Sequence, residues 1–306
     1  DDYLDHALCY ALIDIGNARG TLAGLKSRSS LVRRLSLIAL NRMGTELSID
    51  QVLPLLDTND PALKRAALEI AAGHPSWAKN IASLIDGWLK ARAPDASHLT
   101  MLRGSIKAFS SDAGVRLVVA SHLEDEASAG RKLVSLLDAI ARCGSTGLPA
   151  EWVKGFHEVL DRNDNSLRGQ AVATLRALGE TGFRTRLLEL ARTPGLPLEL
   201  RVSALASVTR DRGELDDHSF SLLLAQLNPD RQSSLRLQAT RALADAALNL
   251  EQLGRLAEQL PQCGPLELPL LAGAFERPAT GFHVNVDVDV KDAASGRVSG
   301  THRGKA

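Results

Sequence analysis

Four titratable residues that lie close together in the sequence, Glu151, His157, Glu158 and Asp161, are the first candidates for chemistry. Residues 157, 158 and 161 share part of one face if this segment is a helix. A histidine beside carboxylates can serve acid/base catalysis or bind a metal ion. Charged residues also cover the solvated side of most surface helices, and we favour that simpler interpretation here.

Two further groups contain side chains of the types that bind metals. His6 and Cys9 lie one helical turn apart, and His283, Asp287 and Asp289 would project from one face of a strand. A soft metal ion would suit the first pair, but neither group supplies a closed set of ligands. We therefore predict no metal site, and we expect His6 and Cys9 to belong to a packed helix.

The motifs that usually mark catalysis are absent from the sequence. It contains no C-x-x-C-H, H-E-x-x-H, G-x-S-x-G or phosphate-loop motif. Trp77, Trp88 and Trp152 are most simply core residues between helices, and stacking on a ligand is the alternative interpretation. We predict no catalytic residue and no cofactor, and hence a protein that is not an enzyme.

A short recurring pattern indicates which elements position these residues. It consists of an aliphatic residue, a basic residue, a small residue four positions after the first, and an apolar residue four positions further on. Its basic residues are spaced 31, 104, 33 and 35 positions apart, and degenerate copies near Arg103 and Arg131 fill the long interval. Steps of four place the apolar positions on one helix face, and a period near 33 indicates a repeat array. The basic residues of the pattern are Arg33, Lys64, Arg168, Arg201 and Arg236.

Each period also holds a second apolar segment, so the repeat unit is predicted to contain two helices. These segments span 48–57, 75–90, 149–161, 183–191, 218–227 and 250–260. We expect Ser48, Asp60 and Ser97 to begin helices, and Gly44, Gly179 and Gly195 to end them. Such units bury their apolar faces only by stacking. The predicted fold is all-α, a right-handed α-α superhelix of about eight units over residues 1–277.

The repeated basic residue is predicted to have a structural role. It lies at the edge of the core face, where a guanidinium group can reach acidic side chains or carbonyl oxygens in the neighbouring turn. Acidic residues do occur in those turns, namely Asp57, Asp60, Asp164 and Asp230. We therefore interpret Arg33, Lys64, Arg168, Arg201 and Arg236 as a structural ladder rather than as binding residues.

The repeated words resemble the second helix of HEAT repeats: VRRLSLIAL, LKRAALEIA, LRGQAVATL, LRVSALASV and LRLQATRAL. The opening segment DDYLDHALCYALIDI and the two repeats after it resemble, more narrowly, the HEAT segment of planctomycete-type envelope proteins. Those chains join a propeller-like domain of the membrane-bound dehydrogenase type to HEAT repeats and a c-type haem domain. The resemblance implies a fragment of a larger envelope protein and a periplasmic or envelope-associated location.

In HEAT arrays the second helix lines the concave side, so the resemblance implies that positions three, seven and ten of each word form the inner surface. Val202, Ala206 and Thr209 are the small and apolar part of that surface. A mixed surface of this kind suits a peptide, a helix or a neighbouring domain. The polar candidates for binding are Arg34, Asn41, Arg65, Glu69, Arg176 and Arg241.

The charge balance limits the classes of partner. The chain has 36 basic and 36 acidic residues and no apolar run long enough to cross a bilayer. A nucleic-acid groove would need a basic excess, so we expect protein partners or neighbouring domains, no nucleic acid and no membrane insertion. The first function considered is a scaffold. Its alternatives are a HEAT-like DNA-repair glycosylase and a HEAT-like lyase for bilin attachment, both by fold analogy.

A change of pattern separates the last part of the chain, residues 278–306, from the repeats. Apolar and polar residues alternate strictly over 282–290, which predicts a strand, and a Gly/Ser/Lys-rich end follows. The strand either belongs to the edge of a next domain or is a tail unrelated to the array. We expect removal of this tail to leave the helical repeats unchanged.

Overall fold

The computed structural model describes residues 2–91, 96–126, 130–144 and 147–276. All regular elements in this part of the chain are helices, apart from one isolated parallel bridge between Glu214 and Ala247. The prediction of an all-α fold is confirmed. The predicted strand at 282–290, with His283, Asp287 and Asp289, lies outside the described residues.

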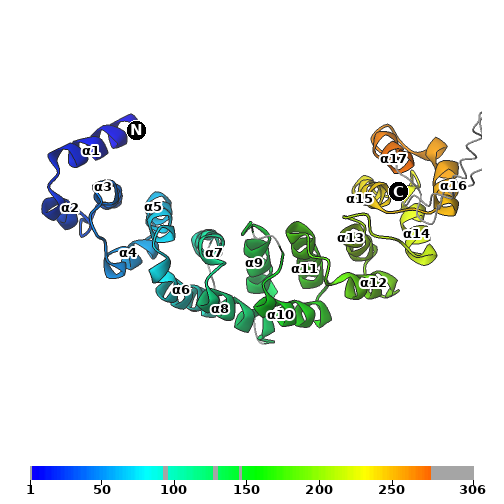
Figure 1. The fold of residues 1–306 in the computed structure, drawn as a ribbon, viewed down its shortest axis with the longest axis horizontal. Coiled ribbons are helices and arrows are strands. Elements are labelled where there is room, and N and C mark those ends of the chain that lie inside the picture. The colour runs from blue at the N-terminus through cyan, green and yellow to red at the C-terminus, as the bar shows by residue number, and fades with distance from the viewer. Residues whose placement is uncertain (1, 92–95, 127–129, 145–146, 277–306) are drawn as a thin grey trace, which may run out of the picture.

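The helices form two layers that follow an arc (Figure 1). The inner, concave layer contains α1 (Asp2–Ile15), α3 (Ser30–Arg42), α5 (Pro61–Ala72), α7 (Ala96–Phe109), α9 (Gly130–Ala141), α11 (Asn165–Leu178), α13 (Leu198–Val208), α15 (Ser233–Asp245) and α17 (Leu268–Phe275). The outer layer contains α2 (Ala18–Gly24), α4 (Ile49–Leu56), α6 (Ala78–Lys90), α8 (Ala113–Glu124), α10 (Ala150–Asp161), α12 (Arg184–Arg192), α14 (Asp217–Leu224) and α16 (Leu250–Gln259). Three short 3₁₀ helices, η1 (Pro75–Trp77), η2 (Ala225–Leu227) and η3 (Leu260–Gln262), adjoin outer helices.

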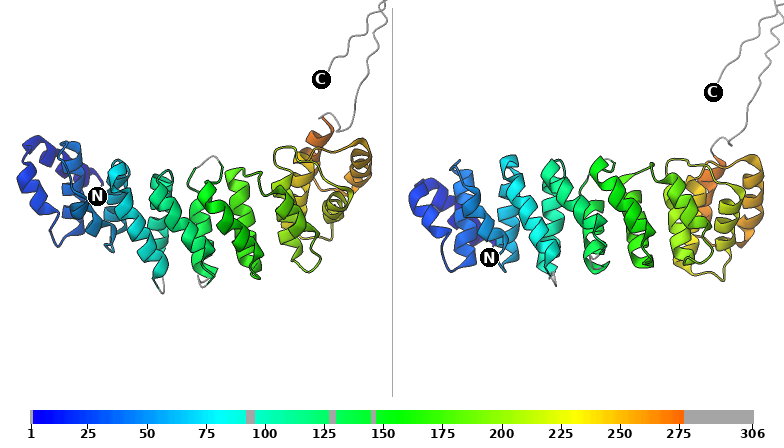
Figure 2. Two further views of the ribbon diagram at one scale, coloured as in Figure 1. Left: turned by 60° about the horizontal axis from the view of Figure 1, so that its bottom comes forward. Right: turned by 90° about the horizontal axis from the view of Figure 1, so that it is seen from below.

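Successive pairs of an outer and an inner helix stack in a row, as Figure 2 shows from two further sides. Each inner helix packs against the inner helices before and after it, for example α9 against α7 and α11. This arrangement is an α-solenoid, in which each unit depends on its neighbours for burial of its apolar face. All recurring words of the sequence lie in the inner layer, and the predicted second segments form the outer helices α4, α6, α10, α12, α14 and α16.

The small residue at position five of the word is buried in every copy, at Ser36, Ala67, Ala171, Ala204 and Ala239. The residue four positions later is buried as well in each copy. Small side chains permit the close approach of neighbouring inner helices. Position one is buried in four copies, but Val32 at the start of α3 is 43% exposed.

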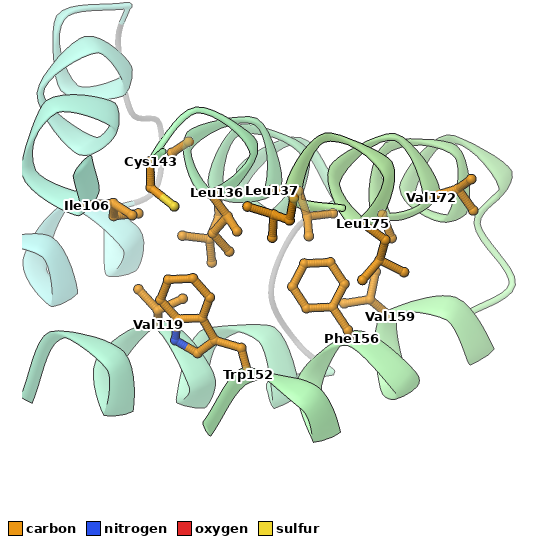
Figure 3. Packing of buried hydrophobic residues seen from close by; sticks show 14 of the residues in the cluster. Ile106, Val119, Leu136, Leu137, Cys143, Trp152, Phe156, Val159, Val172 and Leu175 are labelled. Atoms are coloured by element: carbon orange, nitrogen blue, oxygen red, sulfur yellow. The ribbon is translucent and has the colours of Figure 1, made fainter. Parts of the chain in front are cut away.

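The hydrophobic core is continuous between the two layers. Figure 3 shows Trp152 and Phe156 of α10 extending from the outer layer toward Leu136 and Leu137 of α9. Both aromatic side chains are fully buried. Full burial of a phenylalanine side chain contributes about 1.5–3 kcal/mol of transfer free energy, and the larger tryptophan contributes more.

The helix boundaries agree with most of the capping signals in the sequence. The Asp60 carboxylate accepts a hydrogen bond from the amide of Leu63 at the start of α5, and Gly179 ends α11 with a φ of 68°. Two predicted signals were wrong. Ser97 lies within the first turn of α7, and Gly195 lies beyond the end of α12, where Thr193 is the last cap residue. Because Thr193 is already extended, α12 needs no left-handed glycine.

Candidate interaction surface

The concave side is formed by the exposed stripe of each inner helix. Of the six polar residues predicted to lie on it, Asn41, Arg65, Glu69 and Arg241 are exposed. Arg34 and Arg176 are half-buried. All six belong to inner helices, on α3, α5, α11 and α15.

Arg34 is held by an intramolecular contact. Its guanidinium group forms an ion pair with Asp5 of α1, and the two side chains are 24% and 19% exposed. The pair joins the first two inner helices. Arg34 is therefore a bridging residue in this structure, and a partner would have to compete with Asp5 for it.

The predicted concave stripe is wrong for α13. Val202, Ala206 and Thr209 are buried, whereas Glu199 is exposed and Ser203 and Ser207 are half-buried. Positions three and seven are apolar in this copy, so they remain in contact with the neighbouring helices while the polar residues face outward. Ser203 and Ser207 lie one turn apart, and this polar spacing is the sequence signal that could have indicated a different exposed side for α13.

Two residues of the predicted ladder donate hydrogen bonds to carbonyl oxygens at the end of the preceding outer helix. Arg168 Nε donates to the carbonyl of Leu160 at 3.0 Å, and its Nη2 donates to that of Asp161 at 3.2 Å. Arg201 Nε donates to the carbonyl of Ala191 at 2.6 Å. These carbonyls belong to the last turns of α10 and α12, where no intrahelical donor is available and the helix dipole favours a cation.

The other members of the ladder are placed differently. Arg236 donates to the carbonyl of Pro229 at 3.0 Å and to Glu267 Oε1 at 2.7 Å, so it links α15 to the turn before α17. Arg33 donates to Thr58 Oγ1 at 3.4 Å, and Lys64 is buried. Arg116, at the corresponding position of the outer helix α8, donates to the carbonyl of Ser110 at 2.7 Å. The pair Val115-Arg116 was the available sequence signal for this residue.

Two of the aspartates expected to pair with the ladder are instead helix caps. Asp60 accepts from the Leu63 amide at 2.8 Å and from Ser30 Oγ at 2.7 Å, and Asp164 accepts from the amides of Ser166 and Leu167. The Leu63 amide, followed by Ser30, lowers the pKa of Asp60 below its usual value. Cap geometry brings these carboxylates to the amides of their own helix, away from the preceding carbonyls.

Charge is segregated between the layers. The seven inner helices from α3 to α15 contain 14 basic and four acidic residues, a formal charge of +10. The seven outer helices from α4 to α16 contain eight basic and ten acidic residues, a formal charge of −2. A net charge of zero for the whole sequence therefore conceals a basic inner layer. Net charge alone does not describe the charge of the inner layer.

Several basic residues of the inner layer lie on the surface without an ion pair among the described residues. They are Arg42, Arg65, Lys107, Arg131, Arg176 and Arg241, of which only Arg176 is half-buried. Arg103 and Arg142, by contrast, both bind Asp138, at 2.6 Å and 3.0 Å. The inner layer thus exposes cations that form no ion pair among the described residues, and it holds one carboxylate, that of Asp138, between two arginines.

The cluster first considered for acid/base chemistry does not converge on one point. Glu151 lies 3.6 Å from Arg116, Glu158 lies 3.5 Å from Lys154, and Asp161 pairs with Arg186. The ring of His157 stacks on Phe183 at a centroid distance of 4.5 Å. Each group contacts a different neighbour on the outer layer, so no pair of them shares a substrate-sized space.

The other candidate residues occupy structural positions as well. Trp77, Trp88 and Trp152 are buried, and Trp152 Nε1 donates to the carbonyl of Arg116 at 2.9 Å, which confirms their assignment to the core. Burial raises the pKa of the Cys9 thiol, an effect that Arg42 partly offsets. Among the described residues, no group of three or more His, Cys, Asp or Glu side chains could hold a metal ion.

Hollows occur away from the concave stripe. One of about 440 Å³ lies between the outer helices α6 and α8, where Lys79, Asp86 and Asp112 line it. A second, of about 80 Å³, adjoins the turn after α13 and is lined by Glu180, Arg184 and Asp211. Neither brings together the residues predicted to bind a partner.

In the part of the chain that the structure describes, no helix is both long enough and apolar enough to cross a membrane. No model of a known protein family matches the chain, and no curated protein matches it. A crystal structure of an engineered protein is similar over 87% of this chain and 79% of that one, at 17% identity and a TM-score of 0.42. Similarity of this extent assigns neither a family nor a function.

Proposed function

We propose that the chain is a non-catalytic scaffold of the HEAT-like type, which binds a partner protein or a neighbouring domain along its concave side. The observation that carries this proposal is the set of exposed polar residues on the inner helices α3, α5 and α15. Arg65 and Glu69 on α5 and Arg241 on α15 are exposed members of it. Extended surfaces of this kind are what curved repeat arrays use for recognition.

A second exposed surface supports contact with a neighbouring domain. The helix α1 exposes large apolar side chains, with Tyr3 90%, Leu4 56%, Tyr10 65% and Ile15 71% accessible. Apolar side chains grouped in this way commonly mark an interaction site. The resemblance of the opening repeats to envelope multidomain proteins supports a role in organising domains in the bacterial envelope.

The basic inner layer also favours one enzymatic alternative, a HEAT-like DNA-repair glycosylase. Such an enzyme would present aromatic and acidic side chains to the damaged base. The three tryptophans are 0–8% exposed, which argues against that role. Release of a base from alkylated duplex DNA, measured with the full chain, tests this alternative directly, and turnover would contradict the scaffold proposal.

Site-specific photo-crosslinking tests the scaffold proposal. A photoreactive amino acid would replace Arg65 or Arg241 on the concave side, or Lys79 or Lys154 on the outer helices, in the full chain expressed in its native cell. We expect one protein, or one neighbouring domain, to be crosslinked from both concave positions and from neither outer position. Crosslinks that form only from the outer positions would contradict the proposed face.

A further inference from the structure

The separation of charge between the layers points to the chemistry of the partner. We propose that the concave surface binds an acidic helical segment of another protein, by contacts between its carboxylates and those exposed cations of the inner layer that form no ion pair among the described residues. This inference rests on the proposed scaffold function and specifies its partner.

The available cations extend over most of the array. Arg42 lies on α3, Arg65 on α5, Lys107 on α7, Arg131 on α9 and Arg241 on α15, and all five are exposed. The ladder residues do not belong to this set, because Arg168, Arg201 and Arg236 already donate to carbonyl oxygens. Placement of one exposed cation on each of several successive helices favours a partner that lies across them rather than along one of them.

The spacing of the inner helices suits a helical partner. Packed helices lie about 8–10 Å apart. Carboxylates seven positions apart on a helix are separated by roughly 10 Å along its axis. Between the cations the stripes carry small residues, such as Ala72 and Ala173, which leave room for another helix to approach closely.

The protein itself contains one example of the proposed pairing of charges, between two neighbouring helices of the inner layer. Helix α1 carries Asp5 and Asp14 and has no lysine or arginine, and it packs against α3. Its Asp5 forms the ion pair with Arg34 on the inner layer. An acidic helix thus already pairs with a cation of the inner layer, as its neighbour within that layer.

A polyphosphate partner is less compatible with the same surface. Glu69 follows Arg65 by one turn, Asp245 follows Arg241 by one turn, and Asp138 lies between Arg103 and Arg142. These carboxylates would repel a continuous row of phosphates, whereas a protein segment can place its own basic residues opposite them. The buried tryptophans offer no platform on which bases could stack.

Fluorescence anisotropy with the full chain tests the proposal. The first probe is a labelled, alanine-rich helical peptide whose Glu residues are spaced three or four positions apart, so that they share one helix face. The comparison probes are the same peptide with Gln in place of Glu, a single-stranded DNA and a duplex DNA. We expect the Glu peptide to bind at least about tenfold more tightly than the Gln peptide and more tightly than either DNA, and to be released by salt. Equal binding of the two peptides, or tighter binding of either DNA, would overturn the proposal.

Two variants that each remove four positive charges test where the peptide binds. The inner variant replaces Arg65, Lys107, Arg131 and Arg241 by Gln, and the outer variant replaces Arg19, Lys79, Lys154 and Arg192 by Gln. We expect the inner variant to weaken Glu-peptide binding at least about tenfold and the outer variant to leave it within about twofold. Equal losses in both variants would show an effect of net charge only, and would overturn the assignment to the concave surface.

Further controls distinguish a failure of the inference from misfolding of a variant and from a failure of the scaffold proposal. Circular dichroism verifies the helix content of each variant, and replacement of the three arginines by Lys, with Lys107 kept, should preserve binding because charge is retained. If photo-crosslinking from Arg65 and Arg241 captures a partner whose contact segment is not acidic, the scaffold function stands and this inference fails. If no concave crosslink forms, the scaffold function itself fails.

Discussion

Arg236 Nε of α15 donates a 2.7 Å hydrogen bond to Oε1 of Glu267 in the turn before α17, where the glutamate side chain is only 4% exposed. The bond ties the penultimate inner helix to the last one. The guanidinium group of Arg236 is the main cause that lowers the pKa of Glu267 below its usual value, against the opposing effect of burial. The folded state therefore prefers the ionised carboxylate.

The Arg236–Glu267 pair predicts a dependence of stability on pH. A carboxylate whose pKa is lower in the folded state stabilises that state above its unfolded pKa, about 4.3 for glutamate, and the contribution is lost as pH falls through the folded pKa. We expect Glu267→Gln to cost about 1.5–3 kcal/mol at pH 7. The difference from the parent chain should shrink in acid, as measured by thermal unfolding at pH 7 and pH 3.

The exposed Glu258 of α16 provides the matched control for this experiment. Glu258→Gln should change the unfolding midpoint little at either pH. A Glu267→Gln variant with the same midpoint as the parent at pH 7 would contradict the role given to the pair.

The hydrogen bonds from Arg168 to carbonyl oxygens predict a loss of stability when the guanidinium group is removed. Arg168→Ala leaves the carbonyls of Leu160 and Asp161 at the end of α10 without this cationic donor. We expect a cost of about 1–3 kcal/mol, and partial recovery in Arg168→Lys, which keeps the charge but not the paired donors. Denaturant unfolding measures the cost, and hydrogen exchange should increase at the end of α10.

Arg176, on the same helix but without an ion pair in the described structure, is the control. Its replacement by Ala should change stability by less than about 0.5 kcal/mol. Equal costs for the two substitutions would show that the ladder contact adds nothing specific.

The sequence was sufficient to predict most of the helices, because a small residue recurs at a fixed position of the inner helices. Ala171 and Ala204 illustrate this regularity, as both are fully buried. The outer helices α2 and α8 were not among the predicted segments, and the assignment of the recurring words to the concave side depended on the resemblance to HEAT repeats. The exposed stripe was less predictable, since it depends on how far each helix rotates about its axis. On α13 the apolar Val202 and Ala206 remained in the core, although the register of the word places them on the concave face.

Charge segregation required the three-dimensional assignment of helices to layers. Total composition sums Arg65 and Arg241 of the inner layer with acidic residues of the outer helices, of α1 and of the connecting turns, such as Asp60 and Asp164, so the opposite contributions cancel. The ion pair between Arg34 and Asp5 could not be predicted from the recurring pattern either, because it joins two helices through side chains that the pattern does not specify. Neither relationship follows from spacing along one helix.

Close packing at position five predicts that an enlarged side chain there is harmful. Ala171→Leu inserts three carbon atoms into a fully buried site of α11, and we expect it to cost about 1–3 kcal/mol. Because units depend mainly on their neighbours, the unfolding transition should broaden or lose only part of its amplitude. Ala173→Leu, two residues away on the exposed side, is the control, and an identical melting curve for both would contradict the core assignment.

The outer helices α8 and α10 pack closely at Gly155, where an added Cβ would lie 2.5 Å from Cβ of Leu123. Leu123 cannot withdraw its Cβ without movement of the backbone, so we expect Gly155→Ala to cost about 1–3 kcal/mol despite the better helix propensity of alanine. At Gly169 of α11 an added Cβ meets nothing within 4 Å, and Gly169→Ala should instead stabilise by about 0.5–1 kcal/mol. Denaturant unfolding of the two variants, of Leu123→Gly, and of Gly155→Ala combined with Leu123→Gly measures these effects, because only glycine at position 123 removes the Cβ that the new methyl group would meet. If the clash with Leu123 is the cause, the double variant will be less destabilised than the sum of its single variants, whereas strict additivity would place the cost of Gly155→Ala elsewhere.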